Sequence, residues 1–282
     1  MFDLNQDVEV AFQGEVGAYS ESAVIKIFGP RARPKPCKSF SEVFRTVEDD
    51  VTKFGVVPIE NSIEGSVNPV YDLFLQSDLR VGGELALRIE HCLIANPESA
   101  LSDINVVYSH PQALGQCRSY LEGLDIEMIS TYDTAGSVKM IREKELGDAA
   151  AVAAERAAEI YDMKILAQDI ADTRNNYTRF FVLSKDKAPP TGNDKTSVIF
   201  STKHVAGALY NALGEFATRG INMTKIESRP TKENLWEYNF YLDFVGHIDD
   251  SICAEALEGL ESRSLFVKVL GSYPIEIEKL HD

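Results

Sequence analysis

The first 184 residues alternate short apolar runs with segments of helical spacing, and this alternation limits the possible folds more than any other feature of the sequence. The clearest apolar runs lie at 8–12, 54–59, 104–108, 126–129 and 149–152. Most of them lead through a polar turn into a helical pattern. Strands that alternate with helices in this way form mainly parallel sheets, so the sequence predicts an α/β fold.

A long extended stretch at 79–96 interrupts the alternation. A strand of this length can leave one sheet and enter another, and the apolar run at 177–183 can return the chain to the first sheet. We therefore expect two α/β lobes joined by crossing strands. A cleft between two such lobes is a common place for a small-molecule site.

The segment 184–195 is polar, contains two prolines and a glycine, and is expected to be a surface linker. Behind it a new order of elements is expected: strand, helix, strand, strand, helix and strand, at 196–201, 206–218, 221–228, 236–245, 249–260 and 264–270, with a polar turn at 232–234. This order is the ferredoxin-like plan. The chain thus divides into a two-lobed part at 1–184, a linker at 185–195, a ferredoxin-like domain at 196–274 and a tail at 275–282.

The chain carries 44 acidic against 28 basic residues, a formal net charge of −16. A field of this sign repels nucleic-acid phosphates and anionic lipid headgroups, so neither nucleic acid nor a membrane is expected as a partner. No apolar run approaches the roughly 18 residues of a membrane-spanning helix. Residues 1–7 lack the pattern of a secretory signal, which favours a cytoplasmic location.

The sequence also lacks the common motifs of metal and nucleotide chemistry. It contains no phosphate-binding loop, no glycine-rich dinucleotide fingerprint, no zinc-protease helix and no serine-hydrolase elbow. The four cysteines are scattered and form no C-x-x-C pair, so free thiols are expected rather than a disulfide or zinc site. We therefore expect no metal and no cofactor.

Two polar clusters follow apolar runs in the first 70 residues. Gly14 and Gly17 lead to Ser20 at the start of a helix, where backbone N–H groups can bind an anion. An ordinary glycine turn capped by Ser20 is the alternative. Further on, Glu60 and Asn61 stand where a strand ends. They form either an acid–base site, in which apolar neighbours raise the pKa of the carboxyl group, or a polar loop before the next helix.

Two more polar clusters lie at later strand ends. His110 and Gln112 stand at a strand-to-helix junction, and His110 suits either an acid–base group or a helix cap. Thr178 and Arg179 begin another apolar strand. A hydroxyl beside a guanidinium suits a site that binds a carboxylate and gives a proton to a leaving oxygen, but from these residues alone an exposed pair at a strand start is the favoured alternative.

In the last domain, Gly207 opens the first helix and Arg229 stands near the end of the second strand. A small residue at a helix start exposes N–H groups that can hold the carboxylate of a ligand. A plain helix start and a strand-ending turn are the alternative.

In this order, the clusters resemble prephenate dehydratase followed by an ACT regulatory domain, from about residue 8 to residue 274. The matching motifs are Gly14-x-x-Gly17-Ala18-Tyr19-Ser20, Pro58-Ile59-Glu60-Asn61-Ser62, His110-Pro111-Gln112, Asp133-Thr134-Ala135, Asn176-Tyr177-Thr178-Arg179-Phe180, Gly207-Ala208-Leu209, Glu227-Ser228-Arg229-Pro230 and the segment 268–274. The fold that the resemblance implies is α/β, with a two-lobed, periplasmic-binding-protein-like catalytic part and a ferredoxin-like βαββαβ ACT domain.

The resemblance implies a carbon–oxygen lyase of phenylalanine biosynthesis, which converts prephenate to phenylpyruvate, water and carbon dioxide without a metal or cofactor. The catalytic residues that it implies are Thr178, Glu60, Asn61 and Gln112. Among them, Thr178 is expected to serve the leaving oxygen. The substrate-binding residues that it implies are Arg179, Ser62, Ser20, Thr134 and Phe180.

For the ACT domain, the resemblance implies allosteric feedback regulation by L-phenylalanine and a homodimer or homotetramer. The effector-binding residues that it implies are Gly207, Ala208, Leu209, Glu227, Ser228 and Arg229. The residue before Gly207 is often proline in this family and is Ala206 here, which leaves the effector affinity open. Two alternatives remain: an arogenate dehydratase, whose substrate bears an amino group in place of the keto group, and a non-catalytic amino-acid sensor.

Overall fold

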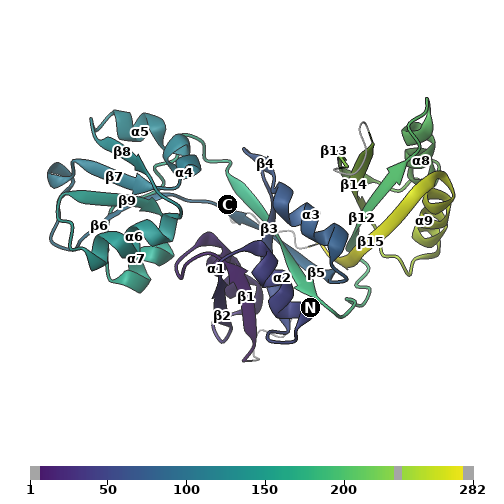
Figure 1. Cartoon of the computed structure of the whole chain (residues 1–282), viewed down its shortest axis with the longest axis horizontal. Helices are drawn as coiled ribbons and strands as arrows, with labels where there is room; N and C mark the ends of the chain where they lie inside the picture. Colours follow the sequence, from purple (N-terminus) through teal and green to yellow (C-terminus); the bar gives the residue numbers. More distant parts are fainter. Residues whose placement is uncertain (1–6, 232–236, 276–282) are drawn as a thin grey trace. The chain divides into compact units, whose positions relative to one another are not determined.

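The computed structural model describes residues 7–231 and 237–275 of the chain. The turn expected at 232–234, the first residue of the strand expected at 236–245 and residues 276–282 of the expected tail lie outside the described residues. Within the described ranges the expected fold class is confirmed, because two α/β lobes are followed by a βαββαβ domain (Figure 1).

The first lobe is built on a sheet with the strand order β2-β1-β3-β11-β5. β1 (Glu9–Gln13) pairs in parallel with β2 (Arg33–Cys37) and β3 (Phe54–Asn61), as the strand–helix alternation predicts. β4 (Gly65–Ser66) turns back antiparallel to the end of β3. The polar residues Glu60 and Asn61 thus stand at the carboxyl end of β3, which is where ligands bind in an α/β sheet.

Helices α1 (Tyr19–Phe28) and α2 (Phe40–Glu48) connect the parallel strands. In α2, Val43, Phe44 and Val47 are buried at helical spacing and form its core-facing stripe. The helix begins after Ser39, whose hydroxyl accepts a hydrogen bond from the backbone N–H of Glu42. Cap and apolar stripe together explain why this segment is helical.

The second lobe has the strand order β10-β6-β9-β7-β8. β7 (Val106–Ser109) is parallel to β8 (Glu127–Ser130) and β9 (Ala149–Ala153), whereas β6 (Cys92–Ala95) is antiparallel to β9 and to β10 (Lys164–Ala167). The sheet is therefore mixed, not purely parallel as the alternation alone suggests. The reason is that β6 enters directly from the first lobe, without a preceding helix to reverse its direction.

The helices of the second lobe begin where the sequence places their caps. Pro111 occupies the first turn of α4 (Pro111–Gln116), after His110 as N-cap. The Asp133 carboxylate caps α6 (Thr134–Glu143) by accepting from the N–H of Gly136 at 2.7 Å. The remaining helices are α5 (Arg118–Glu122) and α7 (Glu155–Tyr161).

Two segments cross between the lobes. β5 (Arg80–Arg88) continues through residues 89–91 into β6, and residues 168–176 lead back into β11 (Tyr177–Ser184). The two crossings are joined by backbone hydrogen bonds from Ile89 N to the Asn176 carbonyl (2.8 Å) and from Ile170 N to the His91 carbonyl (3.0 Å). The predicted change of sheet within 79–96 and the return near 177–183 are both confirmed.

The last domain is a four-stranded antiparallel sheet in the order β13-β14-β12-β15. Its elements are β12 (Asp194–Thr202), α8 (Ala208–Ala217), β13 (Met223–Pro230), β14 (Tyr238–Val245), α9 (Ser251–Arg263) and β15 (Ser264–Pro274). Val198, Phe200, Leu242 and Phe244 alternate along the strands and form the core with both helices. Strand β12 begins at Asp194, two positions before the predicted strand, so the last residues of the predicted linker are part of the sheet.

The elements of the described residues that the apolar pattern did not predict include β2, α2 and β10. β2 contains Pro34 and Pro36, which disfavour a strand assignment, yet it lies at the end of the strand order, where proline is tolerated. A further helix, α3 (Asn68–Gln76), starts close to Ser66, where a helix was considered.

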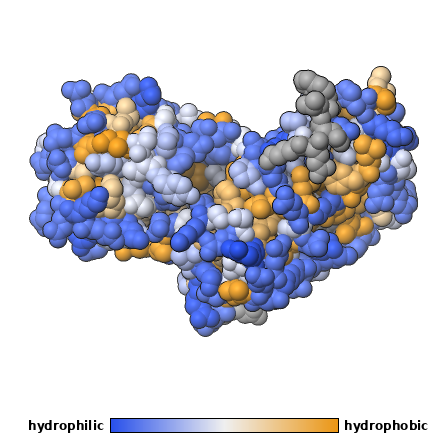
Figure 2. Space-filling model, viewed as in Figure 1, coloured by the Kyte–Doolittle hydropathy of each residue, from blue (hydrophilic) through white to orange (hydrophobic). Residues whose placement is uncertain are grey.

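The chain divides into two compact units. One contains residues 69–85 and the described residues from 181 onward, and the other contains the described residues up to 68 together with 86–180. This division runs through β5 and β11, and it groups α3 with the C-terminal domain, whereas the sequence places a boundary near residue 184. Hydrophilic residues cover most of the face shown in Figure 2. Within residues 7–231 and 237–275, no helix is long and apolar enough to cross a membrane.

Candidate active site

The end of β3 and the start of β11 bring two of the predicted motifs together. These strands are neighbours in the first sheet. The N–H of Ser62 donates to the Tyr177 carbonyl at 2.8 Å. The Ser62 hydroxyl donates to the Asn175 carbonyl and accepts from the Tyr177 N–H, both at 2.9 Å. Ser62 therefore links the end of β3 to the start of β11 through these hydrogen bonds.

The side chain of Asn61 has a defined orientation. Its Oδ1 accepts hydrogen bonds from the backbone N–H groups of Ile63 and Glu64, each at 3.0 Å. Because a backbone N–H can only donate, this atom must be the amide oxygen. The opposite atom, Nδ2, then donates to Thr178 Oγ1 at 3.0 Å and to Asn176 Oδ1 at 2.8 Å.

The contact with Asn61 determines what the Thr178 hydroxyl can do. An amide N–H that points at Oγ1 occupies a lone pair of the hydroxyl oxygen. The hydroxyl hydrogen takes no part in this contact and can be donated in another direction. The geometry therefore favours Thr178 as a hydrogen-bond donor over Thr178 as a nucleophile.

A second pair lies on the other face of the same two strands. Arg179 Nη1 is 3.8 Å from the Glu60 carboxylate, and the side chains are 16% and 36% exposed. Neighbouring residues of a strand point to opposite faces, so this pair and the Thr178–Asn61 pair leave the sheet in opposite directions. Phe180 is only 1% exposed, so its side chain packs in the core.

Gln112 lies on the exposed first turn of α4. It lines a hollow with Ile63 and Glu64 of the first lobe, Gln116 of the second lobe and Asp172 of the returning crossing segment. The loop that follows Asn61 and the helix that follows His110 thus border the same space.

Ser20 and Thr134 lie in the first turns of α1 and α6, and Ser20 is buried. Their two loops approach each other, since Lys139 of α6 pairs with Glu15 at 3.2 Å. The Gly17 turn also needs its glycine. With φ of +93°, a Cβ on Gly17 would stand 2.9 Å from the Cα of Ala157.

In the last domain, the predicted effector residues fall into two places. Gly207 adopts φ of +79° as the N-cap of α8, and Ala208 and Leu209 line a hollow with residues of β12 and β14. Arg229 of β13 instead forms an ion pair of 2.8 Å with Asp72 of α3.

The other two predicted residues of β13 are Glu227 and Ser228. The Glu227 carboxylate lies 3.2 Å from Lys225 on the same strand. Ser228 is exposed and stands opposite Phe240, which itself lines the hollow at the start of α8.

Comparison with protein families matches residues 10–188 to prephenate dehydratase. The chain belongs to the prephenate dehydratase family. A bifunctional chorismate mutase/prephenate dehydratase of Aquifex aeolicus is 42% identical to it, over 96% of this chain and 75% of the relative. Arogenate dehydratase/prephenate dehydratase 2 of Arabidopsis thaliana is 43% identical, over 97% and 74%.

Solved structures agree with this membership. A prephenate dehydratase of Arthrobacter aurescens in complex with L-Phe superposes with a TM-score of 0.87 at 33% identity, covering 95% of this chain and 90% of that one. A structure described as a novel type of quorum quenching acylase has the same TM-score at 34% identity, with coverages of 94% and 97%. The expected lyase class and two-lobed fold are thus confirmed for this prephenate dehydratase family member.

A part-buried chain of hydrogen-bonded side chains, which the sequence did not predict, lies behind the Asn61 and Thr178 motifs of this family member. Asn176 Nδ2 donates to Gln116 Oε1, and His91 Nε2 lies at the same distance of 2.9 Å from that oxygen. The other ring nitrogen of His91 is 2.7 Å from the Tyr19 hydroxyl. Two sequence signals could have indicated this chain: a histidine inside the apolar stretch 79–96, and a glutamine one helical turn after Gln112.

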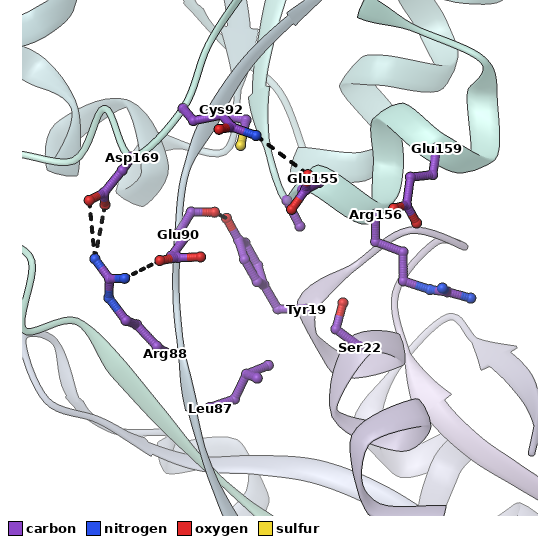
Figure 3. A pocket seen from close by; sticks show the side chains of 12 residues that line it. Tyr19, Ser22, Leu87, Arg88, Glu90, Cys92, Glu155, Arg156, Glu159 and Asp169 are labelled. Carbon is purple, nitrogen blue, oxygen red and sulfur yellow. Dashed lines mark hydrogen bonds and ion pairs between the residues drawn. The ribbon is translucent and has the colours of Figure 1, made fainter. Parts of the chain in front are cut away.

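A second hollow lies beside the crossing segments (Figure 3). Within it the Tyr19 hydroxyl donates to the Glu90 carbonyl at 2.8 Å. Arg88 pairs with Glu90 and, at 3.1 Å, with Asp169. These contacts tie α1 of the first lobe to both crossings.

Proposed function

We propose that this chain converts prephenate to phenylpyruvate, water and carbon dioxide. The observation that carries the proposal is the contact of Asn61 Nδ2 with Thr178 Oγ1, in a chain of the prephenate dehydratase family. It presents the Thr178 hydroxyl hydrogen to a ligand as a donor. A donor of this kind is what a leaving hydroxyl group needs.

The reaction gives each polar residue a defined task. The electron pair of the bond to the ring carboxylate moves into the ring as carbon dioxide leaves, and the ring C–O bond breaks as its oxygen takes up a proton to form water. The ring becomes aromatic, which supplies the driving force. Thr178 donates a hydrogen bond to the departing oxygen. Arg179 leaves the sheet on the other face beside Glu60, so its proposed pairing with a carboxylate requires the substrate to extend past the strand end to that face. Gln112, Ser20 and Thr134 supply further donors from the surrounding helix starts.

Threonine is a weak acid, so Thr178 cannot be the final source of the proton by itself. Its contribution is greatest when it stabilises negative charge that develops on the leaving oxygen. Orientation of the ring against fixed donors supplies a further part of the rate acceleration. Asn61 supports both effects because it holds the Thr178 oxygen in place.

We also propose that L-phenylalanine regulates the enzyme through the C-terminal domain. The Arthrobacter aurescens relative was solved in complex with L-Phe. The hollow at Ala208 and Leu209 lies at the N-terminus of α8, where N–H groups favour a carboxylate. Glu227, Ser228 and Arg229 complete the proposed effector site in a homodimer or homotetramer, and the expected cytoplasmic location belongs to the same proposal.

The acylase description of one similar structure raises the possibility of a hydrolytic function, which the Thr178 geometry disfavours. A threonine nucleophile needs a base that accepts its proton. Asn61 does the opposite here, since its N–H points at the oxygen. The dehydratase is therefore the better supported function.

Steady-state kinetics with prephenate and arogenate test the proposal. We expect phenylpyruvate to form from prephenate, with a higher kcat/KM than arogenate shows. A preference for arogenate would change the substrate assignment while the lyase class stands. A folded protein without turnover of either compound would contradict the enzyme and favour the amino-acid sensor.

A further inference from the structure

The donors and acceptors of the part-buried hydrogen-bond chain behind Thr178 can be assigned one after another from one end. The backbone N–H groups of Ile63 and Glu64 fix Oδ1 of Asn61 as the acceptor, as described above. Nδ2 of Asn61 must therefore donate to Oδ1 of Asn176. The other amide atom of Asn176 is then a nitrogen, and it donates to Oε1 of Gln116 at 2.9 Å.

The same logic assigns the protons of His91. Oε1 of Gln116 can only accept, so the ring nitrogen 2.9 Å away, Nε2, must carry a hydrogen. His91 is 2% exposed, and burial lowers the pKa of its imidazole, so the ring is neutral near pH 7. A neutral ring that carries hydrogen on Nε2 has an acceptor at Nδ1. The Tyr19 hydroxyl lies 2.7 Å from this acceptor and 2.8 Å from the Glu90 carbonyl, and its single hydrogen is shared between these two acceptors.

The two donors next to Gln116, Asn176 Nδ2 and His91 Nε2, thus both point towards its Oε1. On one side Asn61 donates to Asn176 and Asn176 donates to Gln116, while on the other side His91 donates to Gln116. Gln116 Oε1 is the shared acceptor. Burial raises the pKa of Tyr19, which keeps its hydroxyl a donor.

We propose that His91 and Gln116 are positioning residues that fix the direction of these hydrogen bonds and so hold Thr178 as the donor to the leaving oxygen. The proposal rests on the proposed dehydratase function. Loss of the Gln116 acceptor leaves two buried N–H groups without a partner, one from Asn176 and one from His91. Asn176 can then rotate its amide, which would set its Nδ2 against Nδ2 of Asn61 and displace Asn61 from Thr178.

The chain also crosses the connection between the lobes. Tyr19 lies on α1 of the first lobe and Gln116 on α4 of the second, while His91 and Asn176 belong to the two crossing segments. A rotation of one lobe against the other strains these contacts. The donor position of Thr178 is therefore coupled to the relative orientation of the lobes.

Two variants of Gln116 separate positioning from packing. Gln116→Glu keeps oxygen acceptors for Asn176 and His91, whereas Gln116→Met keeps the length of the side chain and removes the acceptor. We expect Gln116→Met to lower kcat for prephenate by about 10-fold or more, with KM changed by less than about 3-fold. Gln116→Glu should keep kcat within about 5-fold of the wild type. Unchanged kcat in Gln116→Met, or equal losses in both variants, would overturn the proposal.

Nuclear magnetic resonance of protein labelled with ¹⁵N-histidine tests the direction without turnover. We expect His91 near pH 7 to be neutral with its hydrogen on Nε2, assigned by comparison with His91→Gln. A hydrogen on Nδ1 alone, or a charged ring, would overturn the assigned direction. If the expected tautomer is found in a protein without dehydratase activity, the direction of the chain stands and the proposed function fails, so the two failures can be told apart.

Discussion

The neighbouring Asn61 side chain determines whether the Thr178 hydroxyl acts as a donor or as an acceptor. Its oxygen receives the Asn61 N–H at 3.0 Å, and Asn61 is oriented in turn by two backbone N–H groups of its own loop. A hydroxyl in this position is prepared to donate before substrate arrives. Pre-oriented donors of this kind are among the largest contributions to catalysis.

Substitution of Thr178 tests this role directly. Thr178→Val keeps the shape of the side chain and removes the donor, so kcat should fall by about 100-fold or more. Thr178→Ser keeps the hydroxyl and should retain most of the activity. Circular dichroism of both variants controls for folding. Near-normal turnover in a folded Thr178→Val would show that another group serves the leaving oxygen.

His91 should leave a signature in the stability of the protein against pH. Its pKa is lowered in the folded state by burial, from an ordinary value of 6.5. As the pH falls through this value, the unfolded chain binds the proton first, so the free energy of unfolding decreases.

The measurement is the urea midpoint between about pH 7.5 and pH 5.5 for wild type and His91→Gln. The wild-type midpoint should fall more steeply than that of the variant, because only the wild type carries the buried imidazole of His91. Parallel curves would show that His91 takes up its proton equally well in the folded protein.

At the scale of elements, α3 follows the Asn61 motif in the chain and packs against the C-terminal domain. It begins at Asn68, two residues after β4 and close behind the loop that orients Asn61. Asp72 on this helix pairs with Arg229 of β13 at 2.8 Å, and Tyr71 packs edge-on against Tyr241 of β14. At its end, Lys268 of β15 donates to the Ser77 carbonyl at 2.7 Å. The helix is thus held by three strands of the regulatory sheet.

Asp72→Asn should weaken regulation more than catalysis. Loss of the charge on Asp72 releases the proposed effector residue Arg229 from α3, so the fold-inhibition by L-phenylalanine should shrink, while kcat without effector stays within about 2-fold. Asp78→Asn, at an exposed position shortly after the same helix, is the matched control. A full response to L-phenylalanine in Asp72→Asn would place the coupling elsewhere.

The elements that the sequence predicted best are those with a helix-capping residue or a regular spacing of apolar residues. α6 follows Asp133 as its cap, and the βαββαβ order of the last domain follows from helical and alternating spacing. β2 was missed because its prolines oppose a strand, and its position at the sheet edge is a tertiary property. The direction of β6 likewise depends on a partner more than 50 residues away.

The candidate site was also predicted only in part, because local signals are visible in the sequence and tertiary contacts are not. Its residues at strand ends, such as Asn61 and Thr178, carry local polar signals that point to a crevice. The buried supports His91 and Gln116 come from segments distant in sequence, and only folding brings them to a common hydrogen bond. The sequence likewise gave no signal that Arg229 would meet Asp72, since β13 and α3 are far apart in the chain.

At the scale of the whole molecule, an excess of negative charge surrounds a site proposed for a dianion. The chain has a formal net charge of −16, and hydrophilic residues cover most of the face in Figure 2. Arg179 is 16% exposed at the strand end, and helix starts with N–H groups lie at Ser20 and Thr134. Short-range donors in a partly buried site outweigh a distant field that salt screens over about 10 Å.

The prolines of β2 have a consequence for how copies of the protein behave in concentrated solution. The N–H of Arg33 donates inward, to the Val8 carbonyl at 2.8 Å, so by alternation positions 34 and 36 face outward. Because both are proline, the outer edge of this strand offers no N–H at these two positions. A strand of another molecule therefore cannot form these hydrogen bonds with the edge, and such edge-to-edge pairing is a step towards fibrils.

Replacement of both prolines tests this protection. Pro34→Thr/Pro36→Thr restores two outward N–H groups on an otherwise suitable strand, so the variant should aggregate faster on incubation at high concentration, as followed by light scattering. Pro189→Thr, in the linker, is the control. An unchanged aggregation rate would mean that the edge is shielded by other means. The same two prolines that oppose a strand assignment from sequence thus also limit the pairing of β2 with other molecules.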